Sequence, residues 1–363
     1  MIYNLGELFS GPGGLAYGAI TADIGDPNFK IVHAWANDYD DSTCRTYRRN
    51  ICKNDDDDSV YCGDVRKLDI SDKNPLFSKH PFNAFAFGFP CNDFSTVGEQ
   101  KGFDGTYGPL YTYGVKVLNK FEPDWFLAEN VSGLSSANDG GAFPKILHDL
   151  HKCGKHGYRL YPHLYKFEEY GVPQARHRII IIGIRGDLPY EFKPPAPTTP
   201  NPTQYRSCGE ALTQPPIADT VKNNELPRMT DTVKARLSYI KPGQNAFNAD
   251  IPKELQLKVK GAKISQIYRR LDSTKPAYTV TGSGGGGTHI YHWSETRALT
   301  NRERARLQTF PDHYEFIGTR ENVRRQIGMA VPSDGARIIF EAVLKTMAGI
   351  SYESVDCNID KLE

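Results

Sequence analysis

A cysteine directly after a proline is the residue of this chain best placed to do chemistry. Cys91 follows Pro90 in the stretch Gly-Phe-Pro-Cys-Asn-Asp-Phe-Ser, which spans residues 88–95. The apolar run at 82–87 before it has the length and composition of a buried strand. A thiol in the loop just after a buried strand is accessible to a substrate rather than buried in the core. We therefore predict that Cys91 is a nucleophile. The alternative for Cys91 taken alone is a small buried hydrophobic side chain.

Two arginines and a glycine-rich turn are further candidates. Arg176 and Arg178 stand two apart in an expected strand edge at 174–178, so both would point to one face and could hold a carbonyl and a phosphate. Their alternative is a surface salt-bridge pair. Upstream, residues 9–14 read Phe-Ser-Gly-Pro-Gly-Gly, which lets the backbone turn tightly into a helix N-terminus. Asp38 ends the next expected strand, where a carboxylate could accept hydrogen bonds from ribose hydroxyls.

The order and intervals of four motifs resemble the DNA (cytosine-5) methyltransferase family. These are the turn at 9–14, the Pro90-Cys91 pair, Glu129-Asn130-Val131, and the stretch at 174–178. The resemblance covers residues 2–184 and 297–345. It implies that Cys91 adds to carbon 6 of a cytosine while Glu129 acts as the acid at ring nitrogen 3. Arg178, with Arg176, would hold the base after it flips out of the duplex.

The resemblance also implies that S-adenosylmethionine is the cofactor, bound at the carboxyl ends of the first strands. Tyr39 would lie against the adenine, and Asp64 would bind its amino edge. The full set of expected cofactor contacts is Phe9, Gly11, Gly13, Gly14, Asp38, Tyr39, Asp64, Val65, Pro90, Leu110, Met329 and Ala330.

Between the two matching regions lies a segment that corresponds to the family's target-recognition domain. Residues 185–296 hold 15 basic and 10 acidic side chains, a net charge of +5, which is typical of a surface facing nucleic acid. The glycine-rich loop at 282–287 permits close backbone approach to a partner, although a flexible surface loop is the alternative reading. The expected DNA contacts are Ser95, Thr279, Ser283, Gly285 and Gly286.

Hydrophobic periodicity predicts an α/β fold with a doubly wound, mostly parallel sheet, the fold of S-adenosylmethionine-dependent methyltransferases, plus a smaller irregular domain. The expected strands are 3–8, 30–36, 83–88, 125–128, 159–165 and 179–184, and the expected helices are 109–120, 142–153, one starting at the capping box Thr300–Glu303, and 336–347. We expect a discontinuous catalytic domain at 1–185 and 297–363 and a target-recognition domain at 186–296. The proline-rich stretch 192–202 marks the boundary.

Composition excludes several classes of protein. The first residues carry no basic leader, and no apolar run approaches 18 residues, so neither export nor membrane spanning is expected. The seven cysteines form no Cys-x-x-Cys pair, and we assign no disulfide and no metal site. We expect a cytoplasmic enzyme, in a bacterium or an infected host cell. It would act on double-stranded DNA as a monomer within a restriction-modification system, and a paired endonuclease is left open.

Three positions depart from the family pattern. Asn92 replaces a glutamine, Met329 replaces an asparagine, and residues 105–110 lack the usual arginine. Cofactor affinity is the property that these changes put in question. Two other functions are possible for this sequence pattern. A transfer-RNA cytosine methyltransferase is disfavoured because the tripeptide Cys-Phe-Thr is absent. A non-catalytic DNA-binding relative is disfavoured because Cys91 and Glu129 are intact.

Overall fold

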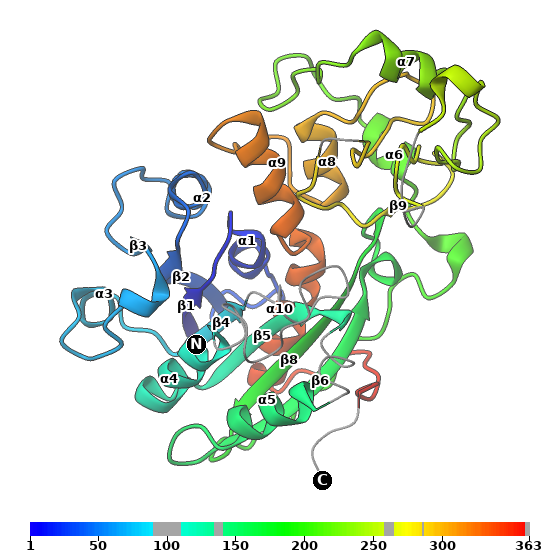
Figure 1. Ribbon diagram of the computed structural model, residues 1–363. Coiled ribbons are helices and arrows are strands. Elements are labelled where there is room, and N and C mark those ends of the chain that lie inside the picture. Colours follow the sequence, from blue (N-terminus) through cyan, green and yellow to red (C-terminus); the bar gives the residue numbers. More distant parts are fainter. Residues whose placement is uncertain (90–109, 134–140, 258–264, 285–286, 360–363) are drawn as a thin grey trace. The chain divides into compact units, whose positions relative to one another are not determined.

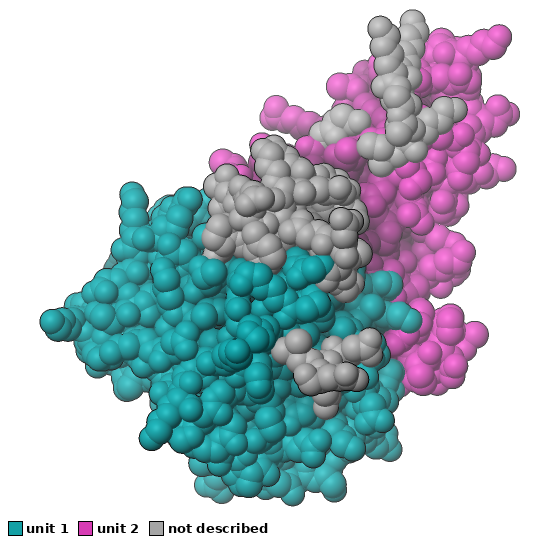
Figure 2. All heavy atoms as spheres, turned by 60° about the horizontal axis from the view of Figure 1, so that its bottom comes forward, with its two compact units in different colours: residues 1–166, 177–197, 335–363 teal, residues 167–176, 198–334 magenta. Residues whose placement is uncertain are grey.

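The structure is a computed structural model, and it describes residues 1–89, 110–133, 141–257, 265–284 and 287–359. The chain divides into two compact units, each treated by itself below (Figure 2). Unit 1 comprises residues 1–166, 177–197 and 335–363, and unit 2 comprises residues 167–176 and 198–334.

Unit 1 is built on a seven-stranded sheet with the strand order β3-β2-β1-β4-β5-β8-β6 (Figure 1). Strands β1 to β5 pair in parallel, and β8 runs antiparallel to both of its neighbours. The strands are β1 (Ile2–Leu8), β2 (Lys30–Asp38), β3 (Val60–Cys62), β4 (Ala84–Gly88), β5 (Trp125–Val131), β6 (Tyr158–Lys166) and β8 (His177–Arg185). The helical elements are α1 (Gly14–Ile20), α2 (Asp41–Tyr47), the π-helical turn η1 (Arg48–Cys52), the 3-10 turn η2 (Val65–Lys67), α3 (Pro75–Lys79), α4 (Tyr111–Phe121), α5 (Ala142–His151) and α10 (Ser333–Ala348).

Apolar side chains cover both faces of this sheet. On one face, Phe85, Phe87 and Phe126 pack with residues of α3, α4 and α5 in one hydrophobic cluster. On the other face, α1 and α2 pack against β2 and β3, and Trp125 contacts Phe340 of α10. Helices on both faces of a mostly parallel sheet make this a doubly wound fold, as the periodicity predicts.

The expected strands and helices of unit 1 are all present, most of them extended by one to three residues. Strand β3 was not foreseen, because three residues are too few to show a period. Among the described residues, no helix is long and apolar enough to cross a membrane.

Unit 2 has little regular backbone pairing. Its one described ladder joins two-residue strands, β7 (Gln174–Ala175) and β9 (Ala277–Tyr278). Its helices are α6 (Cys208–Thr213), α7 (Asp231–Ser238), α8 (Asn301–Leu307) and α9 (Arg320–Met329), with 3-10 turns η6 (Phe167–Tyr170), η7 (Pro202–Gln204) and η8 (Lys253–Leu255). Helix α8 begins with the expected capping box, in which Thr300 and Glu303 each bond the other's backbone N–H.

The compact units and the expected domains divide the chain differently. The unit boundary at 197–198 falls within the proline-rich stretch, but residues 167–176 and 297–334 belong to unit 2 rather than to the sheet-containing unit. The physical reason is that α8 packs against α9 and against α6 of unit 2, whereas Phe340 of α10 contacts Trp125 of the sheet. Which unit carries which part of the function stays a prediction.

Candidate active site

An ion pair lies at the carboxyl end of β5. Strand β8 runs antiparallel to β5, which sets Arg178 opposite Val131 and within reach of Glu129. Arg178 Nε lies 2.8 Å from Glu129 Oε1, and the side chains are only 13% and 14% exposed. Strand β4 supplies the neighbouring edge, where a Cβ at Gly88 would lie 3.1 Å from Glu129 Oε2. Two residues predicted for one pocket are therefore in direct contact, beside the strand that leads to the predicted nucleophile.

The other end of the same pair of strands carries a similar ion pair. Arg185 Nη1 lies 3.0 Å from Asp124 Oδ1, and these side chains are 20% and 23% exposed. This pair closes the amino end of β5, far along the strand from Glu129. The Arg185–Asp124 pair can therefore serve as a control for the Arg178–Glu129 pair at the predicted site.

Asn130 is a site residue whose role sequence reasoning missed. Its side chain is buried, and Nδ2 donates to the carbonyl of Phe89 at a distance of 3.2 Å. That carbonyl belongs to the residue before Pro90, so Asn130 fixes the point at which the chain leaves β4. Pro90, Cys91 and Ser95 themselves lie outside the described residues.

Arg176 does not share a face with Arg178, contrary to the prediction. The strand is interrupted at this residue, since β7 ends at Ala175 and β8 begins at His177. Arg176 is 1% exposed, and its guanidinium donates to the carbonyls of Val280 and Gly328 at 3.0 and 3.1 Å. The period-two argument failed because it assumed one continuous strand. In this arrangement Arg176 holds segments of unit 2 together.

The glycine-rich turn has the backbone geometry that its sequence predicts. Gly11 and Gly13 have φ values of 57° and 94°, a region that favours glycine, and Phe9 shares it at 55°. The Gly11 N–H donates to Asp38 Oδ2 at 3.0 Å, and Gly14 begins α1. Among the described residues, nothing lies within 4 Å of a Cβ built at Gly11, so these residues leave the space over the turn open.

Asp38 joins the ends of three strands. Besides the bond to the turn after β1, its backbone carbonyl accepts the N–H of Gly63 just after β3, at 2.9 Å. Its carboxylate also accepts the backbone N–H of Asp40 at 3.1 Å. Burial raises the pKa of the Asp38 carboxyl to about 6. The Tyr39 N–H also bonds this carboxylate, and a carboxylate has about four acceptor sites, so a ribose hydroxyl could still donate to it.

The remaining predicted cofactor residues of unit 1 differ in exposure. Tyr39 is 72% exposed, so its ring is accessible for stacking against an adenine. Val65 and Leu110 are buried. Asp64 is bonded by the backbone and guanidinium of Arg66, which lowers the pKa of its carboxyl. An adenine amino group could reach Asp64 only if Arg66 moved, which costs little for an exposed ion pair.

Met329 and Ala330 lie in unit 2, at the end of α9. Met329 is 53% exposed, and the N–H of Ala330 donates to the carbonyl of Gln326. Their expected contact with the cofactor stays a prediction.

The predicted DNA contacts of unit 2 have partners within that unit. The Thr279 hydroxyl donates to the carbonyl of Ala175 at 2.7 Å, and the Ser283 hydroxyl bonds that of Thr281 at 2.6 Å. A Cβ at Gly282 would lie 3.0 Å from the backbone of α9, so glycine is needed there for packing within the unit. Gly285 and Gly286 lie outside the described residues.

Comparisons with known proteins identify the family of this chain. The family described as C-5 cytosine-specific DNA methylase matches residues 3–345. The chain is 58% identical over 364 residues to the type II methyltransferase M.BbvI of Brevibacillus brevis, covering 99% of this chain and 96% of that one. It is 39% identical over 355 residues to the type II methyltransferase M.NgoFVII of Neisseria gonorrhoeae, covering 96% and 88%.

A solved structure shows the same fold. It is that of a prophage-encoded protein of E. coli, described as a DNA modification methyltransferase, which matches with a TM-score of 0.71 and 22% identity. The match covers 95% of this chain and 99% of the other.

Proposed function

This chain belongs to the C-5 cytosine-specific DNA methylase family and is a DNA (cytosine-5) methyltransferase of the restriction-modification type, and from this premise we propose how it works. We propose that it transfers a methyl group from S-adenosylmethionine to carbon 5 of a flipped-out cytosine in a specific sequence of double-stranded DNA. The reaction would pass through a covalent adduct between Cys91 and the base.

The contact between Glu129 and Arg178 carries this proposal. A carboxyl group 2.8 Å from a guanidinium, both mostly buried, forms a polar pair that can contact the edge of a pyrimidine. Glu129 packs closely against Gly88, where a Cβ would lie only 3.1 Å from Oε2, and Cys91 follows Gly88 by three residues. Asn130 Nδ2 donates to the carbonyl of Phe89, the residue just before Pro90.

The residues would divide the reaction among them. The Cys91 sulfur, as thiolate, forms a bond to carbon 6, and the ring electrons move toward carbon 5. Glu129 donates a proton or hydrogen bond at ring nitrogen 3, and Arg178 holds the carbonyl next to it. When bound, S-adenosylmethionine supplies the electrophilic methyl group. A base such as water then takes the carbon 5 proton, the carbon 5–carbon 6 double bond forms as the bond from carbon 6 to the Cys91 sulfur breaks, and nitrogen 3 returns its proton to Glu129.

The carboxyl ends of β1, β2 and β3 fit the proposed cofactor. The open space over Gly11, the buried carboxyl of Asp38 and the exposed ring of Tyr39 are the elements that a nucleoside would need. Gly11, Asp38 and Tyr39 would hold the nucleoside part, and Met329 would lie near its carboxylate end. Among the described residues, one contact conflicts with that assignment: the Arg66 side chain forms an ion pair with Asp64, the expected partner of the adenine amino group.

We assign target recognition to residues 186–296, whose positive charge suits phosphate contacts. By this proposal the enzyme acts as a monomer on DNA in the cytoplasm, and a paired endonuclease is left open.

The test is a trapping experiment with DNA that contains 5-fluorocytosine. Fluorine cannot leave carbon 5 as a proton does, so the wild-type protein should form a stable covalent complex with DNA in the presence of S-adenosylmethionine. Cys91→Ala should form none and transfer no methyl groups, yet still bind DNA. Cys62→Ser, at an exposed cysteine, should behave as wild type. Normal turnover by the alanine variant would refute the proposal, and trapping of transfer RNA alone would favour the RNA substrate.

A further inference from the structure

Two cysteines of unit 1 lie close to the carboxyl end of β2. Cys44, in α2, is buried, and its thiol donates to the carbonyl of Asp38 at a distance of 3.3 Å. Cys62 is the last residue of β3 and is exposed, and it stands opposite Asp38 in the parallel pairing of β2 and β3. The Asp38 carbonyl also accepts the N–H of Gly63, the residue after Cys62, at 2.9 Å. Both cysteines therefore lie beside the same peptide group.

The alternation of side chains along β3 directs Cys62 toward Cys44. Val60 stands two residues before Cys62, and it packs in one hydrophobic cluster with Ala36 and Cys44. Residues two apart on a strand face the same side of the sheet, so the Cys62 side chain points to the side on which α2 lies. In agreement with this placement, burial and then the neighbouring Cys62 thiol raise the pKa of the Cys44 thiol.

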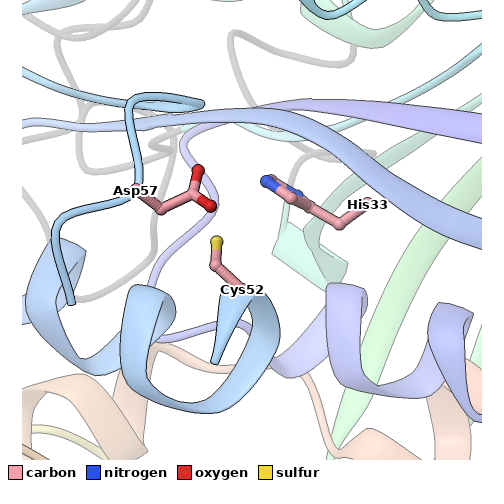
Figure 3. Close-up of side chains that lie close together, drawn as sticks. All are labelled: His33, Cys52 and Asp57. Atoms are coloured by element: carbon pink, nitrogen blue, oxygen red, sulfur yellow. The ribbon is translucent and has the colours of Figure 1, made fainter. Parts of the chain in front are cut away.

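Cys52, at the end of η1, has different neighbours. Figure 3 shows its thiol turned toward His33 and Asp57. Its sulfur lies 3.9 Å from the Ser59 hydroxyl. None of these three groups is a thiol, so an oxidised Cys52 would not find among them a partner for a disulfide. Cys52 is therefore a suitable control for chemistry at the other two cysteines.

We propose that Cys62 and Cys44 are a dithiol that a hydroperoxide converts to a disulfide, and that this disulfide weakens the binding of S-adenosylmethionine. The second half of the proposal rests on the cofactor site proposed above. Cys62 reacts first, because its side chain is exposed to solvent and to a dissolved oxidant. Cys44 is the resolving cysteine, since it is buried directly beside the site of attack.

The two steps transfer two electrons from sulfur to the peroxide. The Cys62 thiolate attacks one peroxide oxygen, the O–O bond breaks, and the departing hydroxide takes up the proton that the thiol had released. The product is a Cys62 sulfenic acid and one water. The Cys44 sulfur then attacks the Cys62 sulfur, the S–O bond breaks, and the hydroxide leaves with the Cys44 proton as a second water.

The disulfide would change the surroundings of the Asp38 peptide. A disulfide sulfur carries no proton, so the Asp38 carbonyl would lose the thiol donor that Cys44 supplies. The bond would also hold α2 against β3, with the two Cβ atoms about 3.8 Å apart. Of the expected cofactor contacts, Tyr39 lies between Asp38 and α2, and Asp64 follows Cys62 by two residues. We expect S-adenosylmethionine to bind about fivefold more weakly, the worth of one hydrogen bond.

The experiment treats the reduced full-length protein with hydrogen peroxide, blocks the remaining thiols by alkylation, and digests the product without reduction. Mass spectrometry should find the peptides of Cys44 and Cys62 linked, with the loss of two hydrogen atoms. Calorimetric titration of the oxidised protein should show the fivefold weaker binding, and a thiol reductant should restore the original Kd. Detection of the link does not require methyl transfer, so it is independent of the proposed function.

The variants assign the effect to this pair. Cys62→Ser should form no link and keep its S-adenosylmethionine affinity after peroxide treatment, whereas Cys52→Ser should behave as wild type in both respects. In Cys44→Ala the Cys62 sulfenic acid should persist and be trapped by a dione reagent. Circular dichroism checks that each variant is folded.

Three results would overturn the proposal: no linked peptide in the wild-type protein, a linked protein with unchanged affinity, or an equal loss of affinity in Cys62→Ser. Failure of the untreated protein to bind S-adenosylmethionine would instead contradict the proposed function, so the two failures are distinguishable.

Discussion

The hydrogen bonds that stabilise the interior of unit 1 differ in kind from those that stabilise the interior of unit 2. In unit 1, seven strands pair through their backbones, and aromatic side chains fill the space between sheet and helices. In unit 2, buried arginine and glutamine side chains bond to backbone carbonyls that no strand satisfies. Arg270 bonds the carbonyls of Leu237, Ile240, His292 and Glu295, and Arg302 bonds those of Lys222, Pro311 and Tyr314.

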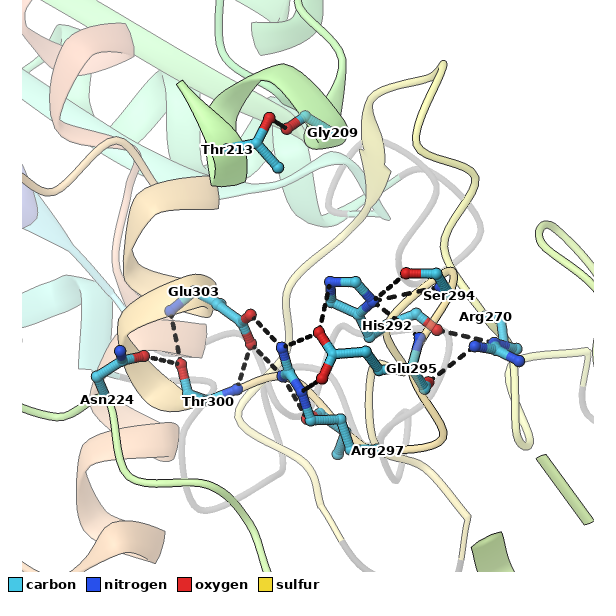
Figure 4. A network of polar contacts seen from close by, with 11 residues as sticks. Gly209, Thr213, Asn224, Arg270, His292, Ser294, Glu295, Arg297, Thr300 and Glu303 are labelled. Carbon is cyan, nitrogen blue, oxygen red and sulfur yellow. Dashed lines mark hydrogen bonds and ion pairs between the residues drawn. The ribbon is translucent and has the colours of Figure 1, made fainter. Parts of the chain in front are cut away.

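Figure 4 shows part of this arrangement around Arg270 and Arg297. The Arg297 guanidinium bonds both Glu295 and Glu303, and Glu303 closes the capping box of α8 with Thr300. A guanidinium has five N–H donors, so one arginine can replace several ladder bonds. The comparison teaches that an irregular fold can satisfy its backbone through a few multivalent side chains, and that it then depends strongly on each of them.

The largest expected effect distinguishes a catalytic carboxylate of unit 1 from a structural one. Glu129→Gln should lower kcat about 100- to 10,000-fold, the usual range for loss of a general acid, with little change in S-adenosylmethionine affinity. Asp124→Asn is the matched control, because it breaks the equivalent ion pair at the other end of β5. Single-turnover kinetics of both variants measures this. If the two lose activity equally, the effect of Glu129 is structural.

The next prediction tests the dependence of unit 2 on single arginines. Arg270→Met should destabilise unit 2 by roughly 3–5 kcal/mol, because four backbone carbonyls lose the guanidinium and, among the described residues, only that of Leu237 keeps a backbone donor, the N–H of Ile240. Arg270→Lys should not rescue it, since one ammonium group cannot reach all four. Arg228→Met, at an exposed position, should change stability by less than about 0.5 kcal/mol. Hydrogen exchange resolved by segment reads each unit separately, and a loss under about 1 kcal/mol for Arg270→Met would contradict the comparison.

A smaller effect concerns pH at the ordered edge of unit 1. Burial raises the pKa of the Asp38 carboxyl to about 6, so this group becomes neutral as pH falls below 6 and loses acceptor sites for ribose hydroxyls. S-adenosylmethionine affinity should therefore fall roughly tenfold between pH 7.5 and 5, the worth of one charged hydrogen bond. Asp38→Asn should bind weakly at both pH values.

Asp64→Asn provides the control for that profile. Arg66 lowers the pKa of the Asp64 carboxyl, which stays ionised over this range, so the variant should keep the wild-type pH dependence. Calorimetric titration at several pH values distinguishes the two. A wild-type affinity independent of pH would remove Asp38 from the cofactor site.

The smallest expected effect asks whether unit 2 contributes to cofactor binding. Met329 stands where the family has asparagine, and a thioether is only a weak acceptor. Met329→Asn should tighten S-adenosylmethionine binding by about 1 kcal/mol, or several-fold in Kd. Calorimetric titration of both proteins measures it. Unchanged or weaker binding would mean that another residue supplies the polar contact, and that Met329 does not face the cofactor.

The sequence by itself determined the local elements of this protein. Strand and helix periods located the sheet of unit 1, the capping box located the start of α8, and the glycines at 11 and 13 predicted a turn with positive φ. These features depend on residues a few positions apart, so short-range sterics and alternating burial encode them.

Only the tertiary structure decided which distant residues meet. Arg178 reaches Glu129 because β8 inserts antiparallel beside β5, and Arg176 turns into unit 2 because the strand breaks at that residue. His33, Cys52 and Asp57 converge although they lie on a strand, a π-helical turn and a loop. Bonds from side chains to backbone carbonyls follow no period along the chain. Their partners are set by the packing of whole segments, which local sequence does not specify.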